Sequence, residues 1–265
     1  MNIGFSKHEK GKLVYYSVDT FTNTGLVRHG FSTRLGGVST GETSSLNLGF
    51  NKKDTHENVR KNFDTICSVL GIDAAMLVLS NQVHENQVRV ITKNDCGKGI
   101  TKESDITGVD ALVCGESGVP FVIFYADCVP VMFLDPVKKV CALAHSGWRS
   151  TVKNICGEVI RVMKKDFCSN PADIICAIGP SIAQCCFEVD DDVAQMFEKK
   201  YYQTRAKKYH IDLWRVVEDQ LLASGVDKKN ITLSNMCTCC NNDIFFSSRA
   251  QNGKMGLMGA FIELI

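Results

Sequence analysis

The chain has 265 residues, of which 45% are hydrophobic and 22% are charged, and its formal net charge is +1. This composition is ordinary for a globular protein, and the near-neutral charge gives no electrostatic basis for binding nucleic acid or a membrane surface. No apolar stretch reaches the length of a membrane-spanning helix, and the first residues, MNIGFSKHEKGK, lack the apolar core of a signal peptide. We therefore expect a cytoplasmic protein.

The N-terminal part of the chain begins with two strand patterns, at residues 12–17 and 28–32. Residues 33–41, TRLGGVSTG, follow as a loop rich in glycine and hydroxyl groups. Such loops can turn backbone N–H groups toward an anion, and Arg34 could hold a phosphate or carboxylate group. A solvated arginine in a surface turn is the alternative interpretation.

Apolar residues at helical spacing predict a helix over residues 55–70, with Thr55 able to cap its start and Gly71 placed to end it. After a short apolar run comes the polar segment SNQVH, which ends in His84. Residues 87–91 alternate like a strand, whereas residues 93–108 have the composition of an exposed loop.

The strongest strand signals lie within residues 119–144, where three short apolar runs are bounded by polar or turn residues, as buried strands are. The loop at residues 135–139 predicts an antiparallel hairpin between the last two runs. In the simplest register Leu134 pairs with Val140, to within about one residue. Either way, Cys128 and His145 meet at the open end of the hairpin.

The segment HSGWRST after this hairpin predicts a helix that starts near Ser150 and continues to about residue 168. A helix N-terminus favours anions, and Arg149 beside it would strengthen that preference. The alternative is that Trp148 and Arg149 simply pack against the end of the hairpin.

The remaining elements are shorter, and no repeat, low-complexity tract or linker separates them. Strands are expected at 173–178, 231–233 and 257–264, and helices at 190–199 and 213–223. We therefore predict one α+β domain over residues 1–265, with a mixed β-sheet core flanked by helices.

Three residues form the first candidate site, because each follows an apolar run and stands where a sheet would reach the surface: His84, Cys128 and His145. A thiolate with two imidazoles suits zinc, and three protein ligands leave a fourth position for water or substrate. A hydrogen-bonded core histidine and a structural cysteine remain the alternative. In a reading without metal, Cys128 is a nucleophile with His145 as its base, and Asp127 orients the histidine or polarises the site.

The chain contains 13 cysteines, spread through apolar segments as well as loops. A chain of this length can build a core without disulfides, so we expect most of them to be buried thiols. The segment CTCC at residues 237–240 crowds three together, but it lacks a partner pair at zinc spacing. We interpret it as structural or redox-prone, and the Cys185–Cys186 pair as packing.

Eight segments occur in the order typical of one family: HGFSTRLGGVS (29–39), SLNLG (45–49), NQVH (81–84), ADCVPV (126–131), AHSGWR (144–149), IGPSI (178–182), FEV (187–189) and FFSSR (245–249). The chain resembles the YfiH or laccase-domain family, also called multicopper polyphenol oxidase-like, or purine nucleoside phosphorylases of the YfiH type. The resemblance extends from about residue 13 to the end. The ADC and HSGWR segments are specific in combination.

The resemblance implies a compact α/β sandwich with one zinc ion, held by residues that match His84, Cys128 and His145. The implied reaction is phosphorolysis of purine nucleosides (adenosine, inosine, guanosine and methylthioadenosine) to base and pentose 1-phosphate, accompanied by adenosine deamination. In such a site Arg34 and Arg149 would bind the phosphate or substrate. Asp127 would be a catalytic proton donor or a partner of the metal ligands.

Four positions depart from the usual family pattern, namely Glu85, Ser150, Ser181 and Ala250, and none is a proposed ligand. Two other functions stay open. A copper-dependent phenol oxidase follows from the family's older name, but six histidines are few for a multicopper centre, so copper is the less favoured metal. A Cys–His hydrolase or amidase linked to editing of peptidoglycan precursors would need Cys128 but no metal. We expect a monomer.

Overall fold

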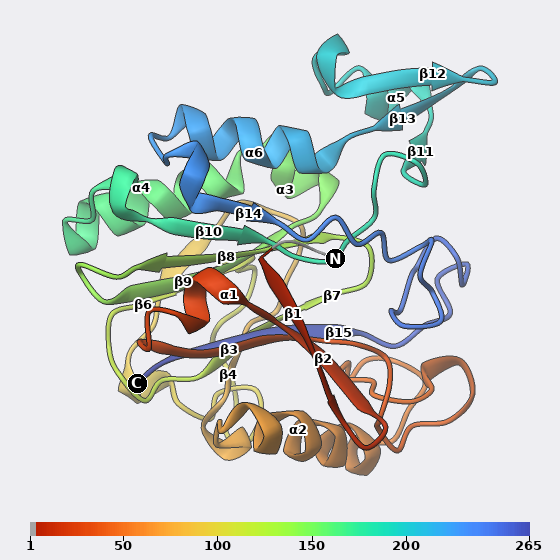
Figure 1. Cartoon of the computed structure of the whole chain (residues 1–265). Helices are drawn as coiled ribbons and strands as arrows, with labels where there is room; N and C mark the ends of the chain where they lie inside the picture. The colour runs from red at the N-terminus through yellow and green to blue at the C-terminus, as the bar shows by residue number, and fades with distance from the viewer. Residues whose placement is uncertain (1–3) are drawn as a thin grey trace.

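Two mixed β-sheets lie face to face, with helices covering the outer face of each, in the computed structural model of the chain (Figure 1). The structure describes residues 4–265. From one edge to the other, the first sheet consists of β1 (Phe5–Lys10), β2 (Leu13–Val18), β3 (Val27–Ser32), β15 (Met258–Leu264), β7 (Phe121–Tyr125) and β4 (Val78–Leu79). The chain's last strand therefore lies inside this sheet, between β3 and β7.

The second sheet is also six-stranded and contains the predicted hairpin at its centre. In order across the sheet, its strands are β14 (Ile231–Leu233), β10 (Ile175–Ile178), β8 (Val129–Asp135), β9 (Val140–Ser146), β6 (Ala111–Cys114) and β5 (Val88–Val90). The pairs β10–β14 and β5–β6 are parallel, and the other pairs of this sheet are antiparallel.

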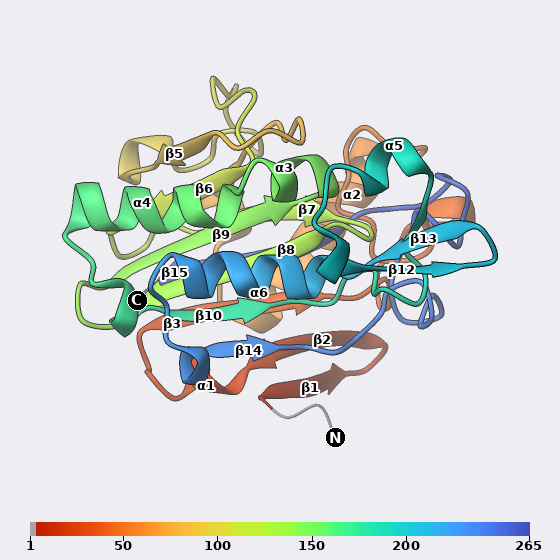
Figure 2. The same cartoon turned by 90° about the horizontal axis from the view of Figure 1, so that it is seen from above.

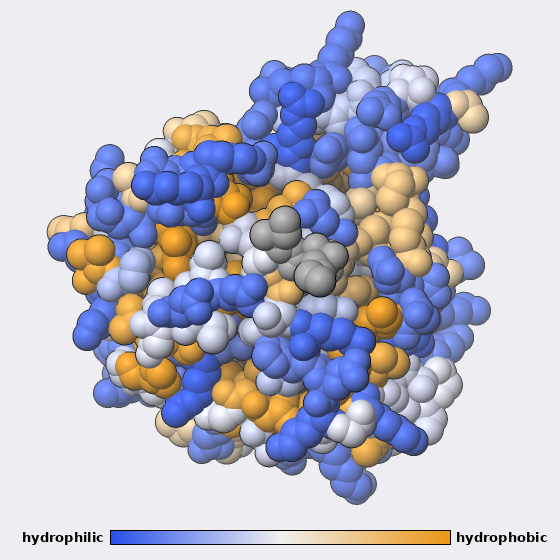
Figure 3. Space-filling view, viewed as in Figure 1, coloured by the Kyte–Doolittle hydropathy of each residue, from blue (hydrophilic) through white to orange (hydrophobic). Residues whose placement is uncertain are grey.

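A three-stranded sheet stands apart from the sandwich at the upper right of Figure 1 and consists of β11 (Glu188–Val189), β13 (Lys208–Ile211) and β12 (Tyr202–Arg205). Its outer surface is mainly hydrophilic (Figure 3). The helices are α1 (Asp19–Thr22), α2 (His56–Leu70), α3 (Trp148–Val152), α4 (Ile155–Phe167), α5 (Asp191–Ala194) and α6 (Leu213–Ala223).

The core has three layers, because side chains alternate between the two faces of each strand. Phe121 and Leu143 belong to the layer between the sheets. Val122 and Phe261 face outward against Phe63 of α2. On the far side α4 and α6 lie next to each other across the second sheet (Figure 2). The predicted α+β fold of mixed sheets flanked by helices is thus confirmed.

All 13 cysteines are free thiols, and most are buried within the core layers, as predicted. Among residues 4–265, no helix combines the length and the hydropathy needed to cross a bilayer.

The register of the central hairpin differs by one residue from the simplest predicted register, which is within the stated tolerance. Leu134 lies opposite Cys141, and Asp135 pairs with Val140, so strand β8 is one residue longer than its apolar run. Asp135 joins the strand because its carboxylate accepts hydrogen bonds from the turn, from Val137 N at 2.9 Å and Lys138 N at 2.9 Å. His145 therefore lies opposite Pro130.

Three predictions need correction. The helix expected near residues 151–168 is split into α3 and α4 at Asn154, which has φ 56° and caps α4 through its side chain. The helix expected over 190–199 is only the four residues of α5. The segment 93–108 is not simply an exposed loop, since Cys96, Ile100 and Ile106 are buried in the core.

Candidate metal centre and its cavity

A cavity of about 840 Å³ opens beside the C-terminal end of β7, within the range of about 300–1,000 Å³ that is usual for small-molecule sites. Part of its wall is apolar and contains Phe50, Phe124, Tyr125, Trp148, Ile182, Phe187, Leu213, Met255 and Leu257. The polar part contains Lys52, Ser80, Asn81, Gln82, His84, Asp127, Cys128, His145, Ser248, Arg249 and Asn252.

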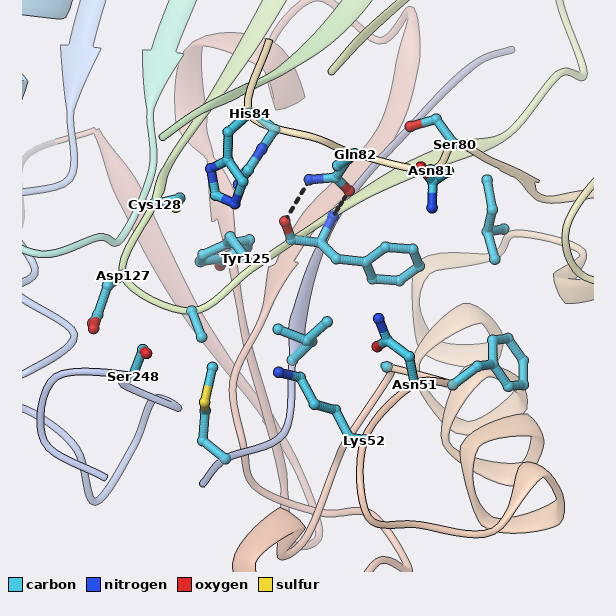
Figure 4. A pocket seen from close by; sticks show the side chains of 18 of the residues that line it. Asn51, Lys52, Ser80, Asn81, Gln82, His84, Tyr125, Asp127, Cys128 and Ser248 are labelled. Atoms are coloured by element: carbon cyan, nitrogen blue, oxygen red, sulfur yellow. Dashed lines mark hydrogen bonds between the residues drawn. The ribbon is translucent and has the colours of Figure 1, made fainter. Parts of the chain in front are cut away.

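The three predicted metal ligands meet in this cavity. His84 follows β4, Cys128 immediately precedes β8, and His145 lies near the end of β9. One ligand atom from each side chain lies within 4.8 Å of the other two. Figure 4 shows His84 and Cys128 side by side at one end of the cavity. The sheets thus bring together three residues that are far apart in the sequence.

The segment that carries His84 is held in place by Gln82. The Gln82 side chain donates from Nε2 to Phe124 O at 2.8 Å and accepts at Oε1 from Phe124 N at 2.7 Å (Figure 4). These two bonds fix the segment to the edge of β7. His84 itself has φ 63°, a left-handed conformation that non-glycine residues seldom adopt and that is found preferentially at functional sites.

Asp110 connects the two histidines, and the sequence analysis did not identify it. Its fully buried carboxylate accepts backbone hydrogen bonds from Val83, His84 and Glu85 at 2.9–3.0 Å. Its Oδ1 also accepts from His145 Nδ1 at 2.8 Å. The only sequence signal for this role is an acidic residue at the start of an apolar run, VDALVC.

The Asp110 contact determines which nitrogen of His145 faces the site. A carboxylate can only accept, so Nδ1 carries the proton and Nε2 is left for Cys128 or a metal ion. Burial raises the pKa of Asp110, but hydrogen bonds from His145 and from the backbone outweigh it and keep the pKa below its usual value. Carboxylate–histidine pairs of this kind orient the ligands of many metal sites.

Cys128 and His145 form an ion pair in which each side chain favours the charged form of the other. Burial raises the pKa of the Cys128 thiol, but the charge and hydrogen bond of His145, with a hydrogen bond from His84, lower it to about 6. Burial lowers the pKa of His145, but Cys128 and Asp110 raise it to about 9. Cys128 is therefore a thiolate near neutral pH, which is the form that binds metals and attacks electrophiles.

A metal ion of the zinc type fits these residues. One thiolate and two imidazoles form a donor set that zinc accepts, with one position left for a further ligand. The backbone also leaves room for the His84 and Cys128 side chains, because Gly147 has no Cβ. A Cβ at this position would lie 2.5 Å from His84 Nδ1 and 3.1 Å from Cys128 Sγ. A side chain at position 147 would therefore collide with His84 and crowd Cys128, which explains the glycine there.

Asp127 lines the cavity, but both of its carboxylate oxygens already accept hydrogen bonds. Oδ1 accepts from Thr238 Oγ1 at 2.6 Å, and Oδ2 accepts from Arg249 N at 2.7 Å. Asp127 has φ 83°, so the chain turns sharply just before Cys128. The carboxylate that orients His145 is Asp110 and not Asp127.

The two predicted substrate arginines lie outside the cavity wall. The Arg34 guanidinium donates to Ser44 O at 2.9–3.0 Å and to Asn242 O at 2.7 Å. Arg149 is exposed and stacks on Trp148, 4.1 Å from the ring centroid. Arg149 belongs to α3, and this five-residue helix is too short for the anion-binding N-terminus that was predicted.

Two cations of the cavity wall were not singled out as substrate-binding residues, and they differ in their contacts. Arg249 donates to the carbonyl oxygens of Cys186 and Glu188 at 2.8–2.9 Å. Lys52 forms no ion pair with any residue of 4–265, and partial burial lowers the pKa of its ammonium group. Figure 4 shows it on the wall facing His84 and Cys128. Sequence alone gave no reason to choose it over the adjacent Lys53.

Glu85 follows the candidate ligand His84, but its carboxylate pairs with Lys153 and it does not line the cavity. Ser181 is also accounted for, because its hydroxyl accepts from Trp214 Nε1 at 2.7 Å.

Known proteins resemble this chain over most of its length. A sequence with the printed name purine nucleoside phosphorylase YlmD, from Bacillus subtilis, is 35% identical over 89% of this chain and 87% of its own length. A purine nucleoside phosphorylase from Bacteroides thetaiotaomicron is 33% identical over 94% of each chain.

Two solved structures are also similar to this chain over nearly its whole length. The crystal structure of YlmD from Geobacillus stearothermophilus has a TM-score of 0.91 and 32% identity, covering 97% of this chain and 98% of that one. The hypothetical protein YfiH from Bacillus licheniformis has the same TM-score of 0.91, with 30% identity over 98% of this chain and 99% of that one. The profile of the family described as multi-copper polyphenol oxidoreductase laccase matches residues 28–265. The chain therefore belongs to this laccase-like family, which includes proteins named YlmD and YfiH.

Proposed function

We propose that the protein is a zinc-dependent purine nucleoside phosphorylase that also deaminates adenosine. Its substrates would be phosphate and adenosine, inosine, guanosine or methylthioadenosine. The observation that carries the proposal is the convergence of His84, Cys128 and His145 in one cavity of about 840 Å³ with aromatic walls and an unpaired lysine. The names of the similar proteins support the phosphorylase reaction.

In this proposal His84, Cys128 and His145 hold the zinc ion, with Asp110 fixing the orientation of His145. Zinc would supply Lewis acidity, both to polarise the substrate and to activate water for deamination. Phe124, Tyr125, Trp148 and Phe187 would pack against the flat purine, since aromatic faces stack on such rings. The Tyr125 hydroxyl is buried and has no hydrogen-bond partner among residues 4–265.

Phosphorolysis breaks the bond between C1′ of the pentose and the purine nitrogen, and a phosphate oxygen forms the new bond to C1′. The purine leaves with the bonding electrons and takes up a proton. We assign phosphate binding to Lys52, because its ammonium is the unpaired cation of the described cavity wall. Contacts from Arg34 or Arg149 would first require these side chains to leave their present partners.

The test is product analysis by chromatography and mass spectrometry after incubation with adenosine, with and without phosphate. Adenine and ribose 1-phosphate should form only with phosphate, and inosine or hypoxanthine would report deamination. Lys52→Met should raise KM for phosphate by about tenfold or more, the value of one lost charged hydrogen bond. Lys53→Met is the matched control, since that side chain is 81% exposed and pairs with Glu42. Intact adenosine with zinc-loaded protein would refute the proposal.

A Cys–His hydrolase is the second candidate, favoured by one observation. The Cys128 thiolate, His145 and Asp110 have the order of nucleophile, base and orienting carboxylate. The two candidates differ in their need for metal. Amide hydrolysis by this arrangement would persist after chelation and disappear in Cys128→Ala. Phosphorolysis would be lost after chelation and also in Cys128→Ala. A multicopper oxidase has less support, because only two histidines line the cavity.

A further inference from the structure

Four cysteines outside the cavity form a second compact cluster, and they come from two loops that are distant in sequence. Cys185 and Cys186 precede β11, and Cys237 and Cys240 follow β14. All four sulfur atoms lie within 4.8 Å of one another. The sulfur atom of Cys185 lies 3.6 Å from Cys186, 3.8 Å from Cys237 and 3.5 Å from Cys240.

These separations match the geometry of a tetrathiolate metal site. At a metal–sulfur distance of about 2.3 Å, the corners of a tetrahedron are about 3.8 Å apart. Four of the six sulfur–sulfur distances are 3.4–3.8 Å and the other two are within 4.8 Å, so the four side chains converge on one point. All four residues are free thiols, so no disulfide accounts for their approach.

The backbone around the cluster has the features of a zinc-binding turn. Cys237 and Cys240 have the C-x-x-C spacing, and Asn241 N closes the turn on Cys237 O at 3.1 Å. The N–H of Ala183 donates to Cys237 Sγ at 3.4 Å, a contact that favours a sulfur atom carrying negative charge. The partner pair that the CTCC segment lacks in sequence is thus supplied by Cys185 and Cys186, 52 residues earlier.

We propose that Cys185, Cys186, Cys237 and Cys240 bind a second zinc ion, in a site separate from the cavity. Four thiolates complete the tetrahedron and leave no position for substrate, so this ion is structural. Cys185 and Cys240 are exposed, which gives the metal a route from solvent. Arg249 donates to Cys186 O at 2.9 Å and brings a positive charge to the loop that would carry the anionic cluster.

The proposed ion would fix one wall of the cavity. Within the loop of Cys185, Ile182 and Phe187 line the cavity, and Ile182 N donates to Asp127 O at 2.9 Å. Within the loop of Cys237, the Thr238 hydroxyl donates to the Asp127 carboxylate at 2.6 Å. Both loops therefore contact the residue before Cys128. Removal of the second metal should loosen this wall without removing any ligand of the first site.

Metal analysis of purified protein tests the proposal directly. The wild-type chain should contain two equivalents of zinc. His84→Ala should lose one of them and keep the other. The double variant Cys185→Ser/Cys240→Ser should lose that other equivalent and keep the one that depends on His84. Cys168→Ser is the control, since this cysteine is exposed at the end of α4, and it should keep both. An unchanged zinc content in the double variant would overturn the proposal.

Alkylation mapping of the wild-type protein gives a second readout that needs no variant. With zinc present, the two exposed cluster cysteines, Cys185 and Cys240, should react with iodoacetamide at least about tenfold more slowly than the equally exposed Cys168, and a chelator should restore their reaction. Equal reactivity of Cys185, Cys240 and Cys168 in the presence of zinc would refute the site. Neither readout depends on nucleoside turnover, so failure of the phosphorylase assay leaves this test intact.

Discussion

At the scale of single residues, Asp110 determines how the two histidines are presented. Each oxygen of Asp110 accepts from two donors, so Asp110→Asn would place an NH₂ group against two of the four: His84 N and His145 Nδ1 at Oδ1, or the N–H groups of Val83 and Glu85 at Oδ2. We expect zinc affinity to fall about 10–100-fold, as for other carboxylates that hydrogen-bond to metal ligands. Stability should fall by about 1–3 kcal/mol because buried polar groups lose their partners.

Competition with a chromophoric chelator measures the affinity, and urea unfolding measures the stability. Asp105→Asn is the control, because the Asp105 side chain is 62% exposed and pairs only with Arg89 and Lys98. If Asp110→Asn binds zinc as tightly as Asp105→Asn, the positioning role of Asp110 is wrong.

The charged pair at the site makes metal binding depend on pH. Without metal, Cys128 has already lost its proton above about pH 6, whereas His145 keeps its proton up to about pH 9. Because a metal displaces the proton from His145 Nε2, binding should release about one proton from this pair between these values. Affinity should therefore rise with pH through this interval by about tenfold per unit.

Calorimetry at one pH in buffers of different ionisation enthalpy counts the released protons. The experiment is done on Cys185→Ser/Cys240→Ser, so that the cysteine cluster does not contribute protons of its own. Binding that is independent of pH between 6.5 and 8.5 would show that the metal-free pair has no proton to release, with a Cys128 thiolate beside a neutral His145, contrary to the raised pKa of His145 described above.

At the scale of elements, the segment between β4 and β5 depends on Gln82. Gln82→Ala removes both hydrogen bonds to Phe124, so His84 should lose its fixed position. We expect a loss of about 1–2 kcal/mol in stability and a larger proportional loss in zinc affinity. Gln87→Ala is the matched control, since Gln87 is exposed on the same segment. Equal behaviour of the two variants in zinc titration would contradict this role.

Periodic apolar runs were enough to predict most of the elements. The runs around Val131 and Ala142 gave the central hairpin, and the caps Thr55 and Gly71 gave the bounds of α2 to within one residue. The hairpin register differs by one residue from the simplest prediction, because a sequence pattern of apolar residues does not include a buried aspartate such as Asp135 in the strand. The split between α3 and α4 was missed because Asn154 adopts a left-handed conformation inside an otherwise helical pattern.

The candidate ligands could be predicted because each lies at or close to the end of a strand, where the sheet itself determines its location. Lys52 and the pairing of Cys186 with Cys240 could not be predicted, because loops place them and loops have no periodic signal. The hairpin of β12 and β13 was also missed, since β12 is mostly exposed and β13 is buried only at its end, so neither strand alternates as a half-buried strand does.

At the scale of the whole molecule, stability depends on the layer between the two sheets. Phe121 is fully buried in this layer, so Phe121→Ala should destabilise the protein by about 3–5 kcal/mol through lost burial and a residual cavity. Val137→Ala removes an apolar side chain that is 66% exposed and should change stability by less than about 0.5 kcal/mol. The urea concentration at the midpoint of unfolding is measured for both variants. A small effect of Phe121→Ala would mean that the sheets can repack around the lost ring.

The location of β15 determines when the protein can fold during synthesis. This strand joins β3 to β7, so the first sheet stays in two parts until residue 264 has left the ribosome. At about 5–20 residues per second, the strands already made wait several seconds with their edges unpaired.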